Sequence, residues 1–103
     1  SIRWLLQTKN TTIEVVIEKE IEKVYKHLLK SNPKDSDILY NFAFFSQLQK
    51  KYSRSEKLYK KFIRFHPNDA EALDNLSLML SLQRKNHQAR KYKKRANALK
   101  EKP

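Results

Sequence analysis

Few residues in this sequence are of types that carry out chemistry, and their spacing does not bring them together. The three histidines, His27, His66 and His87, lie far apart, and none has a second histidine at i,i+4, the spacing of a helical metal site. Cysteine is absent, which excludes disulfides, thiolate ligands and thiol catalysis. No carboxylate pair, catalytic triad or metal-ligand spacing is present. We therefore predict a protein without catalytic residues, a metal site or a cofactor.

Glycine is also absent from the whole chain. A phosphate-binding loop, a dinucleotide fingerprint, a nucleophile elbow and an EF-hand loop all need glycine, either for positive φ or for close approach of the backbone. None of them can be built here. Glycine is also the usual residue of tight hairpins, so its absence argues against an all-β fold.

The composition is that of one small, strongly basic domain. The chain has 103 residues and a net charge of +12, with 39% hydrophobic residues, enough for a packed core. Its longest uncharged stretch runs over residues 38–49, 12 residues, too short to cross a membrane. The first residues lack a methionine, look like the start of an excised fragment and do not form a signal peptide. These features favour a cytoplasmic location.

The two internal prolines, Pro33 and Pro67, are 34 residues apart, which indicates a repeat. Apolar residues around them recur at the spacing of one helix face, and Phe42 and Tyr59 are expected in the core. Three capping signals are read as helix starts: Thr11 to Glu14, Ser53 to Glu56 and Asn68 to Glu71. The sequence therefore predicts an all-α chain with helices over residues 12–31, 36–50, 54–65, 69–84 and 87–100.

The chain resembles the tetratricopeptide repeat (TPR) family. Its pattern, W-x2-L-G-x2-Y followed by A-x3-F and P, is matched in residues 36–69 by Leu39, Phe42, Ala43, Tyr59 and Pro67. The next 34 residues match it with Leu73, Leu76, Ser77, Leu80, Ala89 and Ala96. Departures from the pattern are Ser46, Ser55, Lys93 and Glu101. The pentatricopeptide family, which reads RNA, usually has a 35-residue repeat and fits less well.

The resemblance implies one TPR-like domain over residues 1–103, with its repeats stacked as a short right-handed superhelix of about five helices. We expect an N-terminal segment over 1–10, a capping helix or partial repeat over 11–35, a repeat over 36–69 and a repeat with a basic last helix over 70–103.

In the TPR family the first helix of each repeat lines a concave groove that binds peptides, which implies a protein or peptide partner. We expect Tyr40, Phe44 and Leu78 to be apolar anchors, and Asn41 and Asn75 to bind the peptide backbone. The full set of implied groove residues is Asp37, Tyr40, Asn41, Phe44, Gln47, Leu48, Glu71, Asp74, Asn75, Leu78, Ser81 and Leu82.

The charge of this predicted groove argues against one known family ligand. TPR proteins that bind the acidic C-terminal tails of chaperones use Lys or Arg beside an Asn. Here Asp37 and Glu71 stand four residues before Asn41 and Asn75, where their carboxylates would repel an acidic tail. We expect a partner with apolar anchors and basic flanks instead.

Two alternatives remain open. The last helix is rich in Lys and Arg, and could bind nucleic acid, a ribosome or another anionic surface, with Lys57, Lys60, Lys61 and Arg64 assisting. Its basic patch comprises Arg90, Lys91, Lys93, Lys94 and Arg95. The other alternative is a homodimer through the apolar N-terminal residues Ile2, Trp4, Leu5 and Leu6.

Overall fold

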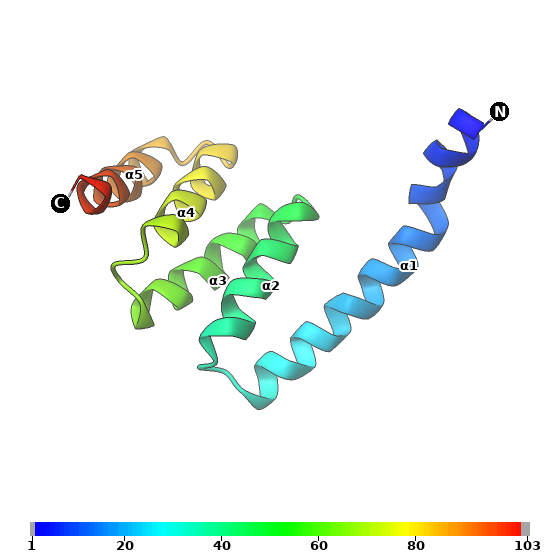
Figure 1. The fold of residues 1–103 in the computed structure, drawn as a ribbon, viewed down its shortest axis with the longest axis horizontal. Coiled ribbons are helices and arrows are strands. Elements are labelled where there is room, and N and C mark those ends of the chain that lie inside the picture. Colours follow the sequence, from blue (N-terminus) through cyan, green and yellow to red (C-terminus); the bar gives the residue numbers. More distant parts are fainter. Residues whose placement is uncertain (1, 102–103) are drawn as a thin grey trace. The chain divides into compact units, whose positions relative to one another are not determined.

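Five α-helices make up the described part of the chain. The structure, a computed structural model, describes residues 2–101, with side chains from residue 13 onward. Its helices are α1 (Ile2–Ser31), α2 (Ser36–Leu48), α3 (Tyr52–Phe65), α4 (Ala70–Leu82) and α5 (Asn86–Lys100), as Figure 1 shows. No strand occurs in these residues. The predicted all-α class is confirmed.

Helix α1 belongs to a compact unit over residues 1–33, and the other four helices belong to a second unit over 34–103. The predicted start of α1 at residue 12 is wrong, because the helix already runs from Ile2 and passes through the expected cap at Thr11 without a break. One line of apolar side chains along α1 is solvent-exposed. This α1 stripe consists of Ile13, Ile17, Ile21, Val24 and Leu28.

The second unit is built from two helix pairs of the same register. Helices α2 and α4 begin 34 residues apart and also end 34 residues apart, and α3 and α5 begin with the same offset. After each first helix the chain reverses through one residue in the left-handed region, Lys50 (φ 62°) and Arg84 (φ 63°). Glycine usually takes this position, and a residue with a side chain costs about 1–2 kcal/mol there.

The core lies between consecutive helices, which pack as α2 on α3, α3 on α4 and α4 on α5. Phe42 and Tyr59, both predicted core residues, are 3% and 0% exposed, so this prediction is confirmed. The remainder of the core consists of Phe62 and of aliphatic and small side chains: Leu39, Ala43, Leu58, Ile63, Ala72, Leu73, Leu76, Met79, Leu80, Ala89 and Ala96.

Serine hydroxyls join the two helices of each pair where they approach most closely. The Ser55 hydroxyl on α3 donates to the carbonyl oxygen of Ala43 on α2 at 2.9 Å. In the second pair the Ser77 hydroxyl on α4 donates to the carbonyl oxygen of Ala89 on α5 at 2.7 Å. Ala43 and Ser77 are equivalent, as are Ser55 and Ala89, so the bond is kept while its donor changes helix. Small side chains at both positions permit the close approach.

One of the two capping predictions in this unit holds. The Asp69 carboxylate accepts from the Ala72 amide at 2.9 Å and caps α4, as predicted. The predicted cap at Ser53 is wrong: α3 begins at Tyr52, and no side chain caps its first turn. The Glu56 side chain, which would complete such a box, instead accepts hydrogen bonds from Gln83 and Lys85 in the turn between α4 and α5.

Candidate functional site

The expected binding surface lies on the first helices of the two pairs, α2 and α4. These helices touch directly, because the Asn75 amide nitrogen donates to the Tyr40 hydroxyl at 3.2 Å. One and two turns beyond this contact, each helix carries exposed apolar side chains. We call them the α2–α4 face: Phe44 (40% exposed), Leu48 (69%), Leu78 (46%) and Leu82 (48%).

Tyr40, one of the three expected anchors, is half-buried in an aromatic cluster. Its ring makes edge contacts with Tyr59 and Phe62, with centroids 5.7 and 5.1 Å apart. Burial, together with the nearby Glu71 carboxylate, raises the pKa of Tyr40 to about 12. The other two expected anchors, Phe44 and Leu78, are exposed. Tyr40 therefore supports the packing of α2, α3 and α4 and holds Asn75 in place.

The remaining predicted groove residues divide between exposed and engaged side chains. Asp37, Asn41, Glu71 and Ser81 are exposed. Gln47 is half-buried and accepts a hydrogen bond from the Tyr59 hydroxyl at 2.9 Å.

Asp74 is also engaged, in ion pairs with α5. Its carboxylate pairs with Lys93 at 3.0 Å and with Lys100. The hydrogen bond from Lys100 lowers the pKa of Asp74. Burial acts in the opposite direction, but Lys93 adds to the lowering, so the pKa lies below its ordinary value. Asp74 lies 34 residues after Tyr40 and occupies the same position on α4 that Tyr40 occupies on α2. At this position the second helix pair therefore has ion pairs where the first has an aromatic cluster.

The two ends of the α2–α4 face carry opposite charge. At the N-terminal ends of both helices stand carboxylates: the caps Asp35 and Asp69, and the exposed Asp37 and Glu71. At the C-terminal ends stand exposed basic residues: Lys50, Lys51, Arg84 and Lys85. This basic end was not predicted from the sequence, although the 34-residue spacing of Lys50 and Arg84 is a signal that could have found it.

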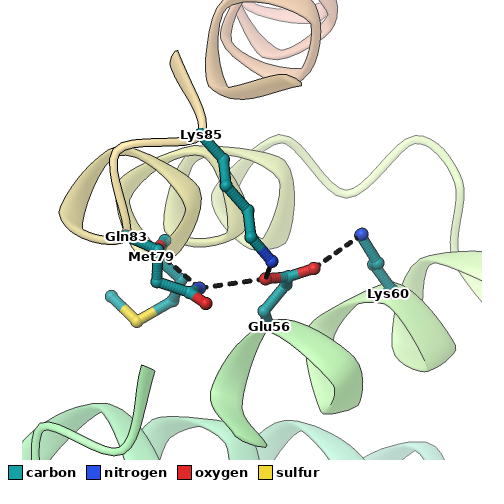
Figure 2. A network of polar contacts seen from close by, with 5 residues as sticks. All are labelled: Glu56, Lys60, Met79, Gln83 and Lys85. Atoms are coloured by element: carbon teal, nitrogen blue, oxygen red, sulfur yellow. Dashed lines mark hydrogen bonds and ion pairs between the residues drawn. The ribbon is translucent and has the colours of Figure 1, made fainter. Parts of the chain in front are cut away.

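A buried carboxylate joins α3 to the turn between α4 and α5 (Figure 2). Glu56 is 6% exposed and accepts from Lys60 at 2.7 Å, from Gln83 at 2.9 Å and from Lys85 at 3.0 Å. Burial by itself raises the pKa of Glu56, but these hydrogen bonds outweigh it and lower the pKa below its ordinary value. This network was not predicted either.

The basic residues of α5 are partly engaged within the fold. Lys93 holds Asp74, and Arg95 lies over the Tyr92 ring at 5.5 Å and donates to the Pro67 carbonyl oxygen at 3.3 Å. Arg90, Lys91 and Lys94 are exposed. Arg90 and Lys94 line a shallow hollow together with Lys93, Asn97, Ala98 and Glu101.

The described part of the chain contains no membrane span and no metal site. Within residues 2–101 no helix is long and apolar enough to span a bilayer. No three His, Asp or Glu side chains gather there in a metal-binding arrangement. His66 stacks on Phe62 and bonds to the Ser36 hydroxyl at 2.8 Å, which accounts for it structurally. The expected dimer contact through Ile2, Trp4, Leu5 and Leu6 falls outside the described side chains.

Comparison with known proteins supports the fold. No family model and no curated protein sequence matches the chain. Among solved structures, a crystal structure of MamA, a TPR-repeat protein, superposes with a TM-score of 0.75 and 18% identity, covering 91% of this chain and 54% of that one. A second, MamA MSR-1 C2, gives 0.74 and 14%, covering 98% and 58%. The chain thus has a TPR-like fold and spans somewhat over half the length of these proteins.

Proposed function

We propose that this chain is a non-enzymatic protein–protein interaction module that binds an apolar partner segment on the α2–α4 face. The observation that carries the proposal is the exposure of four apolar side chains, Phe44 and Leu48 on α2 and Leu78 and Leu82 on α4. The fold repeats them at equivalent positions of two touching helices, and contiguous exposed apolar surface is typical of interaction sites.

The charges around the α2–α4 face restrict the kind of segment that can bind there. Carboxylates at the N-terminal end, Asp37 and Glu71, favour basic residues on that side of the bound segment. The exposed Asn41 and Ser81 can bond to its backbone or side chains. We do not expect an acidic chaperone tail to bind there, because the same carboxylates would repel it.

The experiment is a selection of displayed random peptides on the wild-type chain, followed by titration of the enriched peptides. We expect apolar peptides with basic flanks, and a Kd about tenfold weaker for a variant with Leu48→Gln and Leu82→Gln, since burial of two leucines is lost. Phe65→Gln is the matched control, because Phe65 is an exposed apolar residue on α3. Peptides that bind the double variant as tightly as wild type would overturn the proposal.

The nucleic-acid alternative has one supporting observation, the exposed Arg90, Lys91 and Lys94 on α5. Titration of the selected peptides separates this alternative from the first proposal. If the peptides bind the α2–α4 face, neutralising these three side chains leaves their binding unchanged. The engagement of Lys93 and Arg95 in contacts within the fold favours the α2–α4 face as the main site.

A further inference from the structure

The α1 stripe is the second large exposed apolar surface of the described chain. Ile13 and Ile17 are 63% and 51% exposed, and the stripe continues through Ile21, Val24 and Leu28. From Ile13 to Leu28 it extends about 22 Å, close to the length of about 20 Å of a 13-residue helix such as α2 or α4. The stripe therefore resembles the α2–α4 face in chemistry, and it is about as long as the helices that carry that face.

From residue 13 onward the charges of α1 are separated along the helix. Residues 13–22 contain four glutamates (Glu14, Glu18, Glu20 and Glu22) and a single lysine. Residues 23–31 contain three lysines (Lys23, Lys26 and Lys30) and no acidic residue. The first half of the described stripe is therefore flanked by negative charge and the second half by positive charge.

This order is the same as that on the α2–α4 face, which has Asp37 and Glu71 at its start and Lys50 and Arg84 at its end. Suppose that a helix with the charge order of α1 lies antiparallel to α2 and α4. Its lysines are then beside Asp37 and Glu71, and its glutamates are beside Lys50 and Arg84. The antiparallel direction also opposes the helix dipoles, which is favourable.

We propose that the α2–α4 face binds helix α1 of a second copy of this chain, antiparallel to α2 and α4. The inference rests on the proposed function, because it assigns the occupant of the same face. The contact joins two different surfaces, so each copy still has one free α1 and one free α2–α4 face. Such a heterologous contact extends head to tail into longer assemblies.

The test uses sedimentation of two variants with polar substitutions at exposed positions. The face variant carries Leu48→Gln and Leu82→Gln, and the stripe variant carries Ile17→Gln and Ile21→Gln. We expect the wild type to increase in mass with concentration and each variant to be monomeric. An equimolar mixture of the two forms a 1:1 heterodimer and nothing larger, because only one intact α1 and one intact face remain per pair.

Two further substitutions serve as controls. Phe65→Gln and Val15→Gln, exposed residues off both surfaces, should associate like wild type, and circular dichroism verifies that every variant is helical. A wild type that remains monomeric overturns the proposal while leaving peptide binding to the face testable on its own. A face variant that still self-associates also overturns it, since α1 would then pair with another surface.

The orientation has its own test. Lys50→Glu with Arg84→Glu, or Glu14→Lys with Glu18→Lys, should each weaken self-association by about tenfold. All four substitutions in one chain restore opposite charges at that end, and we expect wild-type association to return. Failure of the fourfold variant to recover contradicts the antiparallel arrangement.

Discussion

Glu56 is the residue whose role differs most from its sequence pattern. The S-x-x-E spacing of Ser53 and Glu56 is that of a capping box, which is satisfied within one helical turn. The carboxylate instead accepts hydrogen bonds from Gln83 and Lys85, in the turn between the two helices of the second pair. One residue thus ties the two helix pairs together through charge-assisted bonds, which are the stronger kind.

Replacing Glu56 tests this tie. Glu56→Gln removes the charge and leaves Lys60 and Lys85 without their counter-ion, although both lysines are partly exposed. We expect the free energy of unfolding to fall by about 1–2 kcal/mol, measured by urea denaturation. The exposed Glu101→Gln is the control and should change stability by less than about 0.5 kcal/mol. Equal effects of the two substitutions would contradict the role given to Glu56.

The lowered pKa values of Glu56 and Asp74 predict a dependence of stability on pH. Both carboxyls have folded-state pKa values below their ordinary values of 4.5 and 3.8. Their stabilising contribution is therefore complete above the ordinary pKa and is lost as the pH falls through the lowered values. We expect the urea midpoint of Glu56→Gln to lie well below that of wild type at pH 7 and to approach it at acidic pH. A midpoint difference that stays constant with pH would exclude this linkage.

At the scale of the helices, Phe42 and Phe44 on α2 form a matched pair. Phe42 is 3% exposed and contacts the Arg54 guanidinium at 4.6 Å, whereas Phe44 is 40% exposed. Phe42→Ala should cost about 3–5 kcal/mol, most of the stability of so small a unit, so that residues 34–103 lose much of their helical circular dichroism signal. Phe44→Ala should leave the helices intact and weaken peptide binding. Similar melting temperatures for both variants would show that the register of α2 is wrong.

Helix periodicity and the 34-residue repeat predicted the elements because both depend on local sequence. Residues 36–50 and 69–84 were expected as helices, and α2 and α4 lie at Ser36–Leu48 and Ala70–Leu82. The same reasoning failed at Ser53, since a local pattern does not reveal whether Glu56 bonds within its own turn or to another helix. For a related reason, the half-buried position of Tyr40 was not predicted. Its burial depends on how α3 and α4 pack against α2, which spacing along one helix does not fix.

At the scale of the whole molecule the positive charge is the dominant property. The net charge of +12 attracts any polyanion at low salt without a specific site. We expect weak binding of single-stranded oligouridine that disappears near physiological salt. Neutralising Arg90, Lys91 and Lys94 to Gln should reduce the log–log salt slope by about 2, since each phosphate contact contributes about 0.7 on single strands. Tight binding that persists at physiological salt would favour the nucleic-acid alternative.

The packing of each helix of the second unit on its neighbours in sequence has a kinetic consequence. The principal contacts of α3 are with α2 and α4, and those of α5 are with α4, so most of the packing joins helices that are neighbours in sequence. Domains of this low contact order reach the native state in microseconds to milliseconds. A newly made chain can thus form α2 and α3 and extend them helix by helix, in the order of its synthesis.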